Sequence, residues 1–513
     1  MTKAVEAPKR WPGITMETLW LVAVLATVFS GVVGQQVHPH DLWWHIRAGH
    51  DIVAARSLST VETLSYTVGG QPLESWAAYW LAEILMYGAY SVGGLDLLVA
   101  LQGALITVAC SLMASICLRR ARSGRIAAGC VLFAALLGAA AWGVRPQALA
   151  YPLMTALMYA IDAYRDKSQR AWLLVPPLCV LLWVNCHPTF PVGIAWIGLW
   201  LLDELWIALK ARSTSPPPQR HVHVLAAAAT LTASCAAVLA NPRCFGIFTY
   251  LSSTTSNAVV RSMTAEWQPP TFETLSGALF LAGLLLTAAL LAVSQRRPSV
   301  GEVGSLLVFG ALGLQTERGG SWFGMALTPV LALSLPWLTR TPREAQTEDS
   351  AAGAVPLSRR ARWLNGALAL LFVGLALARL PWWRASIPGL AGTVGPVPEE
   401  HALAATEVLR AERLPAPLFS DQSFANYLTW AAPEYQVFYY ARVGDPTVAR
   451  DYLWIAGARC GWEDKLDEYG VNSLMLSVRD QPALIEALRA TDGWEELYAD
   501  PYAVLFVRRD RLS

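Results

Sequence analysis

Long stretches without charge are the feature of this sequence that most restricts its fold. Eleven of them approach the ~20 apolar residues that a helix needs to cross the hydrocarbon core of a bilayer. Only 15% of the 513 residues are charged, whereas soluble domains have roughly 25%. The sequence therefore predicts an α-helical polytopic membrane protein with about eleven transmembrane helices. The predicted spans are residues 17–34, 95–118, 126–144, 147–163, 171–186, 190–209, 222–240, 275–294, 300–316, 320–338 and 363–379.

The distribution of lysine and arginine predicts the orientation of these spans. If the N-terminus is cytoplasmic and each stretch crosses once, the cytoplasmic segments hold 20 lysines and arginines and the outer loops hold six. This bias agrees with the positive-inside rule, and an even number of spans would break it. We therefore expect a multi-pass protein of the cytoplasmic (inner) membrane, with a cytoplasmic N-terminus and an extracytoplasmic C-terminal domain.

One further apolar stretch, residues 76–92, is left out of this count. Only Gly93 and Gly94 separate it from the next span, and a crossing here would invert the charge bias of every later loop. We predict that it forms an amphipathic helix along the outer interface, with Glu83 at its polar edge. The first outer loop then extends from residue 35 to residue 94.

The last third of the chain has the composition of a soluble domain. Strand patterns alternate with helical ones there, which is typical of an α/β fold. The expected organisation is a transmembrane domain at 1–380 and a soluble extracytoplasmic α/β domain at 384–513. Residues 211–219 and 341–358 are predicted to be cytoplasmic connections. The expected helices are 399–413, 422–431, 446–457, 461–469 and 481–491, and the expected strands are 416–420, 435–440, 471–477 and two within 495–508.

The net charge of +1 argues against nucleic acid as a partner, because no basic stripe is present to neutralise phosphates. The first outer loop opens with HPHDLWWHIRAGHD, which places four histidines close to Asp41 and Asp51. These histidines could bind a divalent metal, but an HxHD pattern without further ligands is a weak signal, so no metal ligands are assigned. Asp41 directly precedes a helical pattern and has two interpretations. It either caps that helix or serves a function.

Several outer-face residues carry charge at the ends of spans, among them Arg145, Arg243 and Arg318. Arginine in this position commonly extends to lipid headgroups. A cluster of arginines facing a cavity would instead suit a phosphate, because the guanidinium group binds oxyanions through two hydrogen bonds. His187 and Glu266 lie at the same face.

Several motifs resemble one family. DLWWHIRAGHDIV and LSTVETLSYTVGGQPLESWAAYWLAEIL in the first outer loop are similar to the same region of bacterial GT-C-type membrane glycosyltransferases, which use polyprenyl-phosphate-linked sugars. RPQ at 145–147, WVNCHPTF at 183–190, ANPRCFG at 240–246, AEWQPP at 265–270 and TERGGSWFGMALTP at 316–329 extend the resemblance. FSDQSFANYLTWAAPEYQVFYYARVGDP looks like the outer α/β domain that such proteins append.

The resemblance implies a GT-C fold, with a membrane cavity for a lipid phosphate and an acidic residue in the first outer loop. Asp41 takes the acidic position, and Arg318 is expected to hold the phosphate with help from Arg145 or Arg243. The neighbours of Asp41 are His40 and Leu42, so the second adjacent acid of the family pattern is absent and metal dependence is in doubt. The further candidates for substrate binding are His45, Glu83 and His187.

Two functions remain open from the sequence. The first is an inverting glycosyltransferase that moves a sugar from a polyprenyl-phosphate donor to a glycan, lipid or protein hydroxyl, with Asp41 as general base. The second is a non-catalytic membrane protein of the same fold that binds a lipid-linked glycan or scaffolds an envelope assembly. The two differ in whether Asp41 faces the cavity of the arginines or only caps a helix.

Overall fold

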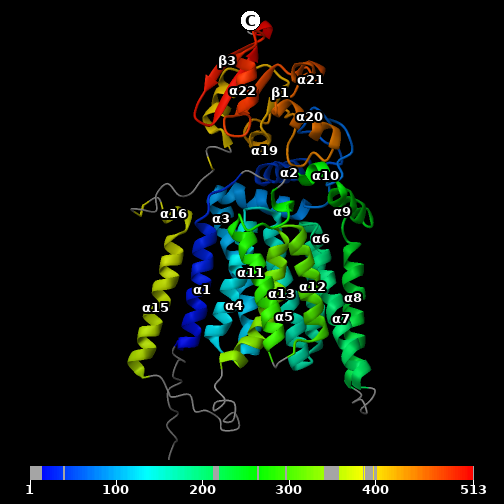
Figure 1. Cartoon of the computed structure of the whole chain (residues 1–513), viewed down its shortest axis with the longest axis vertical. Coiled ribbons are helices and arrows are strands. Elements are labelled where there is room, and N and C mark those ends of the chain that lie inside the picture. The colour runs from blue at the N-terminus through cyan, green and yellow to red at the C-terminus, as the bar shows by residue number, and fades with distance from the viewer. Residues whose placement is uncertain are drawn as a thin grey trace, which may run out of the picture.

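The structure is a computed structural model that describes residues 14–38, 41–211, 219–262, 265–294, 297–339, 358–384, 386–387, 397 and 401–511. Figure 1 shows a bundle of long helices with the C-terminal α/β unit above one of its ends. The predicted cytoplasmic connections at 211–219 and 341–358 fall almost entirely outside the described residues.

Each of the eleven predicted spans is helical. Seven helices in the described part of the chain are long and apolar enough to cross a membrane, and two shorter apolar helices occupy 170–186 and 300–315. The chain is therefore a multi-pass membrane protein, while eleven crossings remain a prediction. The helices are α1 (Met16–Val33), α3 (Trp80–Ala121), α4 (Gly124–Gly138), α5 (Ala150–Lys167), α6 (Val175–Cys186), α7 (Pro191–Ala211), α8 (Gln219–Val238), α11 (Leu275–Val293), α12 (Val300–Gln315), α13 (Gly319–Thr339) and α15 (Arg359–Ala378), with the 3₁₀ turns η1 (Ala139–Ala141), η2 (Pro146–Leu149) and η3 (Arg170–Leu174) between them.

Ion pairs join the helices at the end of the bundle opposite the C-terminal unit. Arg120, on α3, pairs with Glu302 on α12 and with Asp162 on α5. Arg165, on α5, pairs with Asp203 and Glu204 of α7 at 2.6 and 2.8 Å. Because lipid supplies little hydrophobic drive between helices, such polar contacts and close packing fix their positions.

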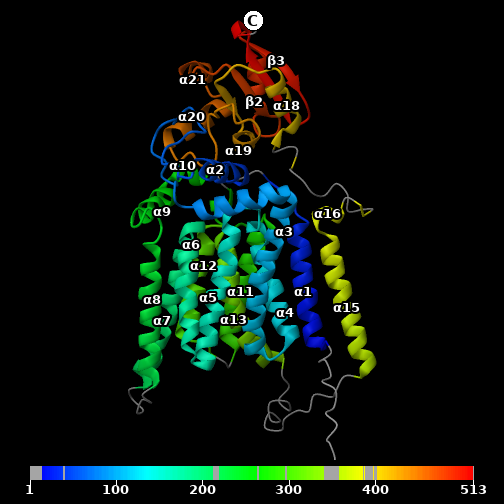
Figure 2. The same ribbon diagram turned by 180° about the vertical axis from the view of Figure 1, so that it is seen from behind.

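Two helical segments of the first outer loop lie at the other end of the bundle. α2 (Leu42–Ala55) packs against α3, whose backbone breaks at Gly93 and Gly94. Gly94 has φ 62° and ψ −155°, a conformation that only glycine adopts readily. The part of α3 before this break lies across the end of the bundle (Figure 2), as predicted for residues 76–92.

The predicted environment of Glu83 is wrong. Its side chain does not lie at a polar edge but is 1% exposed, and it pairs with His45 at 3.1 Å. The reason is that α2 covers this face of α3, so the side chain lies between two helices.

The C-terminal unit contains a four-stranded sheet in the order β1-β2-β4-β3. β1 pairs with β2 in parallel, and β4 pairs with β2 and β3 in antiparallel fashion. The alternation of helices and strands agrees with the sequence prediction at nearly every element. The elements are α18 (Leu403–Ala411), β1 (Leu418–Ser420), α19 (Gln422–Ala431), α20 (Pro446–Ala456), α21 (Trp462–Glu468), β2 (Ser473–Ser477), α22 (Pro482–Arg489), β3 (Trp494–Ala499), β4 (Ala503–Arg508) and η5 (Arg509–Arg511).

The strand predicted at 435–440 is not formed. The backbone N–H of Val437 donates to the carbonyl of Leu64, and the N–H of Tyr66 donates to the carbonyl of Val437. Val437 forms isolated bridges with Ser65 of the first outer loop and with Leu418 of β1, so this segment lies between the loop and the sheet without forming a strand. Trp44 and Val68, from α2 and that loop, belong to the same apolar core as β1 and β2. An independent domain at 384–513 remains a prediction.

Candidate functional site

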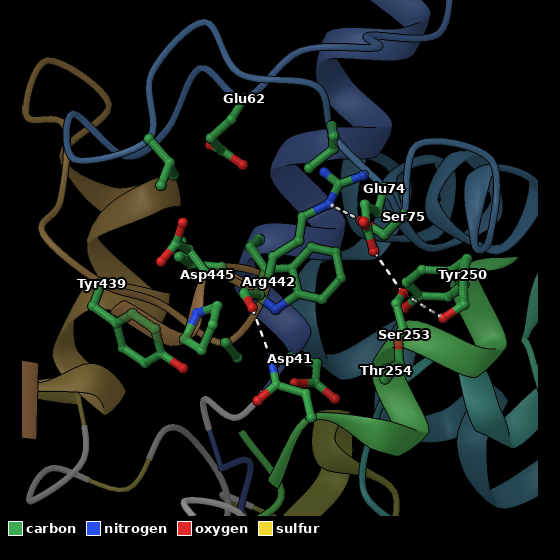
Figure 3. A pocket seen from close by; sticks show the side chains of 18 of the residues that line it. Asp41, Glu62, Glu74, Ser75, Tyr250, Ser253, Thr254, Tyr439, Arg442 and Asp445 are labelled. Atoms are coloured by element: carbon green, nitrogen blue, oxygen red, sulfur yellow. Dashed lines mark hydrogen bonds between the residues drawn. The ribbon is translucent and has the colours of Figure 1, made fainter. Parts of the chain in front are cut away.

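A cavity of about 510 Å³ lies where the first outer loop, the outer ends of the bundle and the C-terminal unit meet. Figure 3 shows side chains of all three parts facing this space. The lining includes Asp41, Trp44, Glu62, Glu74 and Tyr79 from the first part, Tyr250, Trp267 and Arg318 from the second, and Tyr439, Arg442 and Asp445 from the third. Such a mixture of aromatic rings and charged groups suits a ligand that has both hydroxyl and anionic groups.

Asp41 immediately precedes α2 but does not cap it. Its side chain makes no hydrogen bond to the first turn, and its φ of −97° and ψ of −9° differ from the extended conformation of most N-caps. The carboxylate instead lines the cavity (Figure 3). The structure thus places Asp41 in one cavity with Arg318.

Two tyrosines from different parts of the chain lie next to each other in the wall of the cavity. The hydroxyl groups of Tyr79 and of Tyr250, in α9 (Gly246–Ser256), are 3.1 Å apart. Burial raises the pKa of Tyr79 well above its usual value, and the neighbouring Tyr250 and Asp41 act in the same direction. Both phenols therefore stay neutral, and while one donates to the other, the second hydroxyl can donate a hydrogen bond to a ligand.

Arg318 does not stand free in the cavity wall. Its Nε donates to Glu266, in η4 (Ala265–Trp267), and its guanidinium lies 5.9 Å from the ring centre of Trp267. On its other side Glu266 accepts two hydrogen bonds from Arg145, at 2.7 and 2.8 Å. Burial opposes ionisation of Glu266, but Arg318 and Arg145 outweigh it and hold its pKa well below the usual range. The three residues form one group with a net charge of +1.

Arg145 and Arg243 do not line the cavity with Arg318, although the sequence predicted that one of them would help to hold the phosphate. Arg145 is 7% exposed, lies behind Glu266 and is not among the residues that line the cavity. Arg243 lines a separate depression beside Leu73 and Trp76. Of the three arginines expected to gather round a phosphate, the structure brings only Arg318 to the Asp41 cavity.

Arg442 is a cavity residue that the sequence analysis missed. It follows the extended segment at 435–440, its Nε donates to the hydroxyl of Ser75 at 2.8 Å, and its guanidinium lies 5.0 Å from the ring centre of Trp44. Burial disfavours its charge, but nearby Glu83 and Glu62 outweigh this effect and raise its pKa. No carboxylate in the described part of the chain lies within ion-pair distance of it. The only signal in the sequence was an arginine inside the quoted motif FYYARVGDP.

The other predicted ligands lie behind the cavity wall. The His45 ring lies against that of Trp44, with the ring centres 3.5 Å apart and the planes tilted by 32°, and it bonds to Glu83. Burial lowers the pKa of His45, although Glu83 and Asp41 act in the opposite direction. Burial also lowers the pKa of His187 well below its usual value, and Arg318 reinforces the effect. His187 is therefore neutral, and neither histidine is among the residues that line the cavity.

The described residues contain no candidate metal centre, because no three histidine, cysteine or acidic side chains lie together there. Asp51, the second acid of the HPHDLWWHIRAGHD motif, pairs with Arg47 and His50 at 2.9 Å each. His40 lies outside the described residues.

No family model matches this chain, and no curated protein is similar in sequence. Solved structures are similar in fold. The archaeal oligosaccharyltransferase AglB from Archaeoglobus fulgidus, in complex with an inhibitory peptide and a dolichol-phosphate, superposes with a TM-score of 0.54 at 10% identity, over 96% of this chain and 74% of that chain. The A. fulgidus enzyme tethered to an acceptor peptide gives 0.52 at 12% identity, over 95% and 74%. The mycobacterial arabinofuranosyltransferase AftD gives 0.49 at 13% identity, over 97% and 40%.

The two oligosaccharyltransferase structures assign the fold. This chain is a multi-pass membrane protein with the GT-C-like fold of membrane glycosyltransferases and a small C-terminal sheet, as the resemblance in its motifs predicted. At this level of identity the likeness extends to the fold alone.

Proposed function

We propose that this protein is an inverting glycosyltransferase that transfers a sugar from a polyprenyl-phosphate donor to an acceptor hydroxyl. The observation that carries the proposal is the position of Asp41, whose carboxylate caps no helix and lines one cavity with Arg318 and Arg442. A base and a pair of cations in one cavity match the two needs of this reaction, removal of a proton and stabilisation of a leaving phosphate.

In the proposed reaction the acceptor oxygen attacks the anomeric carbon while its proton passes to the Asp41 carboxylate. The bond from the anomeric carbon to the phosphate oxygen breaks on the opposite face, and its electron pair leaves with the lipid phosphate. Arg318 and Arg442 stabilise the negative charge that the phosphate gains. Arg442 thereby takes the supporting role that the sequence assigned to Arg145 or Arg243. Glu266 fixes the orientation of Arg318. The AglB structure was obtained with a dolichol-phosphate, which supports a lipid phosphate as ligand on this fold.

Variants at Asp41 test the proposal in a transfer assay with polyprenyl-phosphate sugars. Asp41→Asn keeps the size of the side chain but cannot take up the proton, so activity should fall by roughly a hundredfold or more. Because Asp41 makes no cap hydrogen bond, thermal stability should stay unchanged in both Asp41→Asn and Asp41→Ala. Wild-type transfer by Asp41→Asn would assign the base to another residue. If no donor supports transfer by the wild type while lipid-linked sugar still binds, the non-catalytic alternative is correct.

We also propose that the cavity opens on the extracytoplasmic side of the cytoplasmic membrane, since the outer loops hold few basic residues. Cys460 is exposed in the C-terminal unit and provides a natural reporter. In a variant with Cys235 and Cys244 replaced by serine, an impermeant thiol reagent should label Cys460 in intact cells. A cysteine placed at Ser168, at the opposite end of the bundle, should stay unlabelled. The reverse pattern would invert the proposed orientation.

A further inference from the structure

A second pair of arginines lies away from the Asp41 cavity, where α15 leads into the short helix α16 (Pro381–Arg384). Arg379 follows the last residue of α15, and Arg384 ends α16. Figure 1 shows α16 directly above α15 and close to the upper end of α1. Leu380, between the two helices, packs in an apolar cluster with Val33 and Leu98, so this junction is anchored to α1 and α3.

The Arg384 guanidinium has too few acceptors in the chain. The side chain is 1% exposed, and its Nη1 donates to the carbonyl of Val33 at 3.3 Å. Among the residues that the structure describes, its Nε and Nη2 are buried without any acceptor, and so is the Nε of Arg379. A buried charged donor without a partner is costly, so three such atoms in two neighbouring side chains indicate that an acceptor is supplied from outside the chain.

No carboxylate serves as that acceptor. Neither Arg379 nor Arg384 has an ion pair within the described residues. Burial and the charge of Arg379 lower the pKa of Arg384, and Asp96 acts only weakly in the opposite direction. Arg379 also lies against the end of α1, because a Cβ atom added to Gly34 would come within 2.4 Å of its Nη2. The two like charges are therefore held near each other by the packing of α1, α15 and α16.

The surroundings place this pair at the level of lipid headgroups. Residues 360–378 form one of the candidate membrane spans, and both arginines follow its end directly. Trp382 and Trp383, between them, are 50% and 56% exposed. Exposed tryptophans beside the end of a span are typical of the bilayer interface, where phosphate groups are the abundant anions.

We propose that Arg379 and Arg384 form a binding site for the phosphate of a membrane lipid in the leaflet on the side of the C-terminal unit. A guanidinium pair offers several donors in the geometry that phosphate oxygens accept. The site is separate from the Asp41 cavity and independent of the proposed transfer reaction. The phosphate could belong to a glycerophospholipid or to a polyprenyl phosphate.

Native mass spectrometry of the full chain, released from nanodiscs, tests this site. The nanodiscs contain phosphatidylcholine with either phosphatidylglycerol or undecaprenyl phosphate added. All variants carry Arg318→Ala, so that lipid bound in the Asp41 cavity does not obscure the result. The parent should retain phosphatidylglycerol or undecaprenyl phosphate in preference to phosphatidylcholine, which also carries a phosphate, and the mass of the bound lipid identifies which of the two sources supplies it. Arg379→Gln with Arg384→Gln should lower retention by about tenfold or more, and Arg384→Lys should lower it less.

Arg410→Gln is the matched control, because Arg410 lies in the C-terminal unit and pairs with exposed Glu434. It should retain lipid like the parent. Equal retention by the double variant, or equal loss in the control, would overturn the site. If the double variant does not fold, thermal melting of the parent and of Arg384→Lys replaces it. Either added lipid should then stabilise the parent more than Arg384→Lys, and no difference between these two would also overturn the site.

Discussion

The guanidinium of Arg145 and the carboxylate of Glu266 form a two-point ion pair, with nitrogen–oxygen distances of 2.8 and 2.7 Å. Glu266 is also bonded to Arg318, so one carboxylate serves two arginines at the edge of the Asp41 cavity. The pairing leaves one positive charge in excess. A lipid phosphate in the cavity would interact with this excess positive charge.

Replacement of Glu266 by glutamine should therefore destabilise the protein and strengthen anion binding. Two guanidinium groups would remain close together without their carboxylate, and loss of one partner of a buried pair costs about 3–5 kcal/mol. The melting temperature should fall in phosphate-free buffer and recover as inorganic phosphate is added. The double variant Arg145→Gln, Glu266→Gln removes both partners and should melt closer to the wild type. An unchanged melting temperature in Glu266→Gln would mean that the ion pair with Glu266 does not hold Arg318 in place.

Arg318 and Arg243 provide a direct comparison, because the sequence analysis gave both a role at the phosphate and the structure brings only Arg318 to the cavity. Arg318→Ala should weaken binding of a polyprenyl phosphate by about tenfold or more, since charge-assisted hydrogen bonds are lost. Arg318→Lys keeps the charge but loses the planar fork, and should bind with intermediate affinity. Arg243→Ala should bind like the wild type. Equal losses at both positions would show that the cavity does not define the site.

The fold could be predicted from the sequence because a membrane leaves the chain few options. Backbone groups in a bilayer must bond within the chain, so every long uncharged run had to become a helix. The break at Gly93–Gly94 was visible because two adjacent glycines interrupt a helical pattern. The C-terminal elements followed from periodicity. Residues 435–440 were the exception, because their backbone bonds to a loop some 370 positions earlier, which no local pattern reveals.

The site was harder to predict from the sequence, because it also depends on contacts between residues far apart in the chain. Asp41 was chosen because it lies in the first outer loop, in the motif that most resembles the family, and Arg318 because it lies at the end of a span. Whether either faces a cavity depends on packing between distant segments. Glu266 comes within bonding distance of Arg145 only through tertiary structure, 121 positions apart. Arg442 becomes part of the site only because the C-terminal unit packs on the first outer loop.

Asp421 predicts a pH dependence for the stability of the C-terminal unit. It accepts a hydrogen bond from the N–H of Ser423 at the start of α19, and burial raises its pKa from 3.8 to about 6. Because the folded pKa is the higher one, its contribution is fully present below pH 3.8 and is lost as the pH rises through about 6. The loss amounts to about 3 kcal/mol at one pKa unit per 1.36 kcal/mol.

Asp421→Asn should therefore raise the melting temperature above pH 6, because asparagine caps a helix without bringing a charge into the core. Below pH 4 the two proteins should melt alike. The comparison is made on the full chain, with the fluorescence of the C-terminal tryptophans as the probe. A variant that is less stable than the wild type above pH 6 would indicate that the carboxylate is needed in its charged form.

Arg442 leads to the last prediction, that the C-terminal unit completes the phosphate site. Its guanidinium lies over Trp44 at 5.0 Å, its Nε is bonded to Ser75, and the described residues offer it no ion pair. Arg442→Gln should thus weaken binding of a polyprenyl phosphate by about tenfold, as Arg318→Ala does. A cation–π contact at a partly shielded site contributes only about 1 kcal/mol, so the fold should survive.

Two further variants separate phosphate binding from support of the fold. Ser75→Ala removes the hydrogen bond to Arg442 but leaves its charge in the cavity, so it should lower phosphate affinity only slightly. Arg410→Gln removes an arginine from the same C-terminal unit, outside the cavity, and should have no effect. If Arg442→Gln lowers the melting temperature but leaves phosphate affinity unchanged, then Arg442 only joins the C-terminal unit to α2. A loss of affinity at constant stability is the result expected of a residue that touches the ligand, because loss of a purely structural contact would lower the stability.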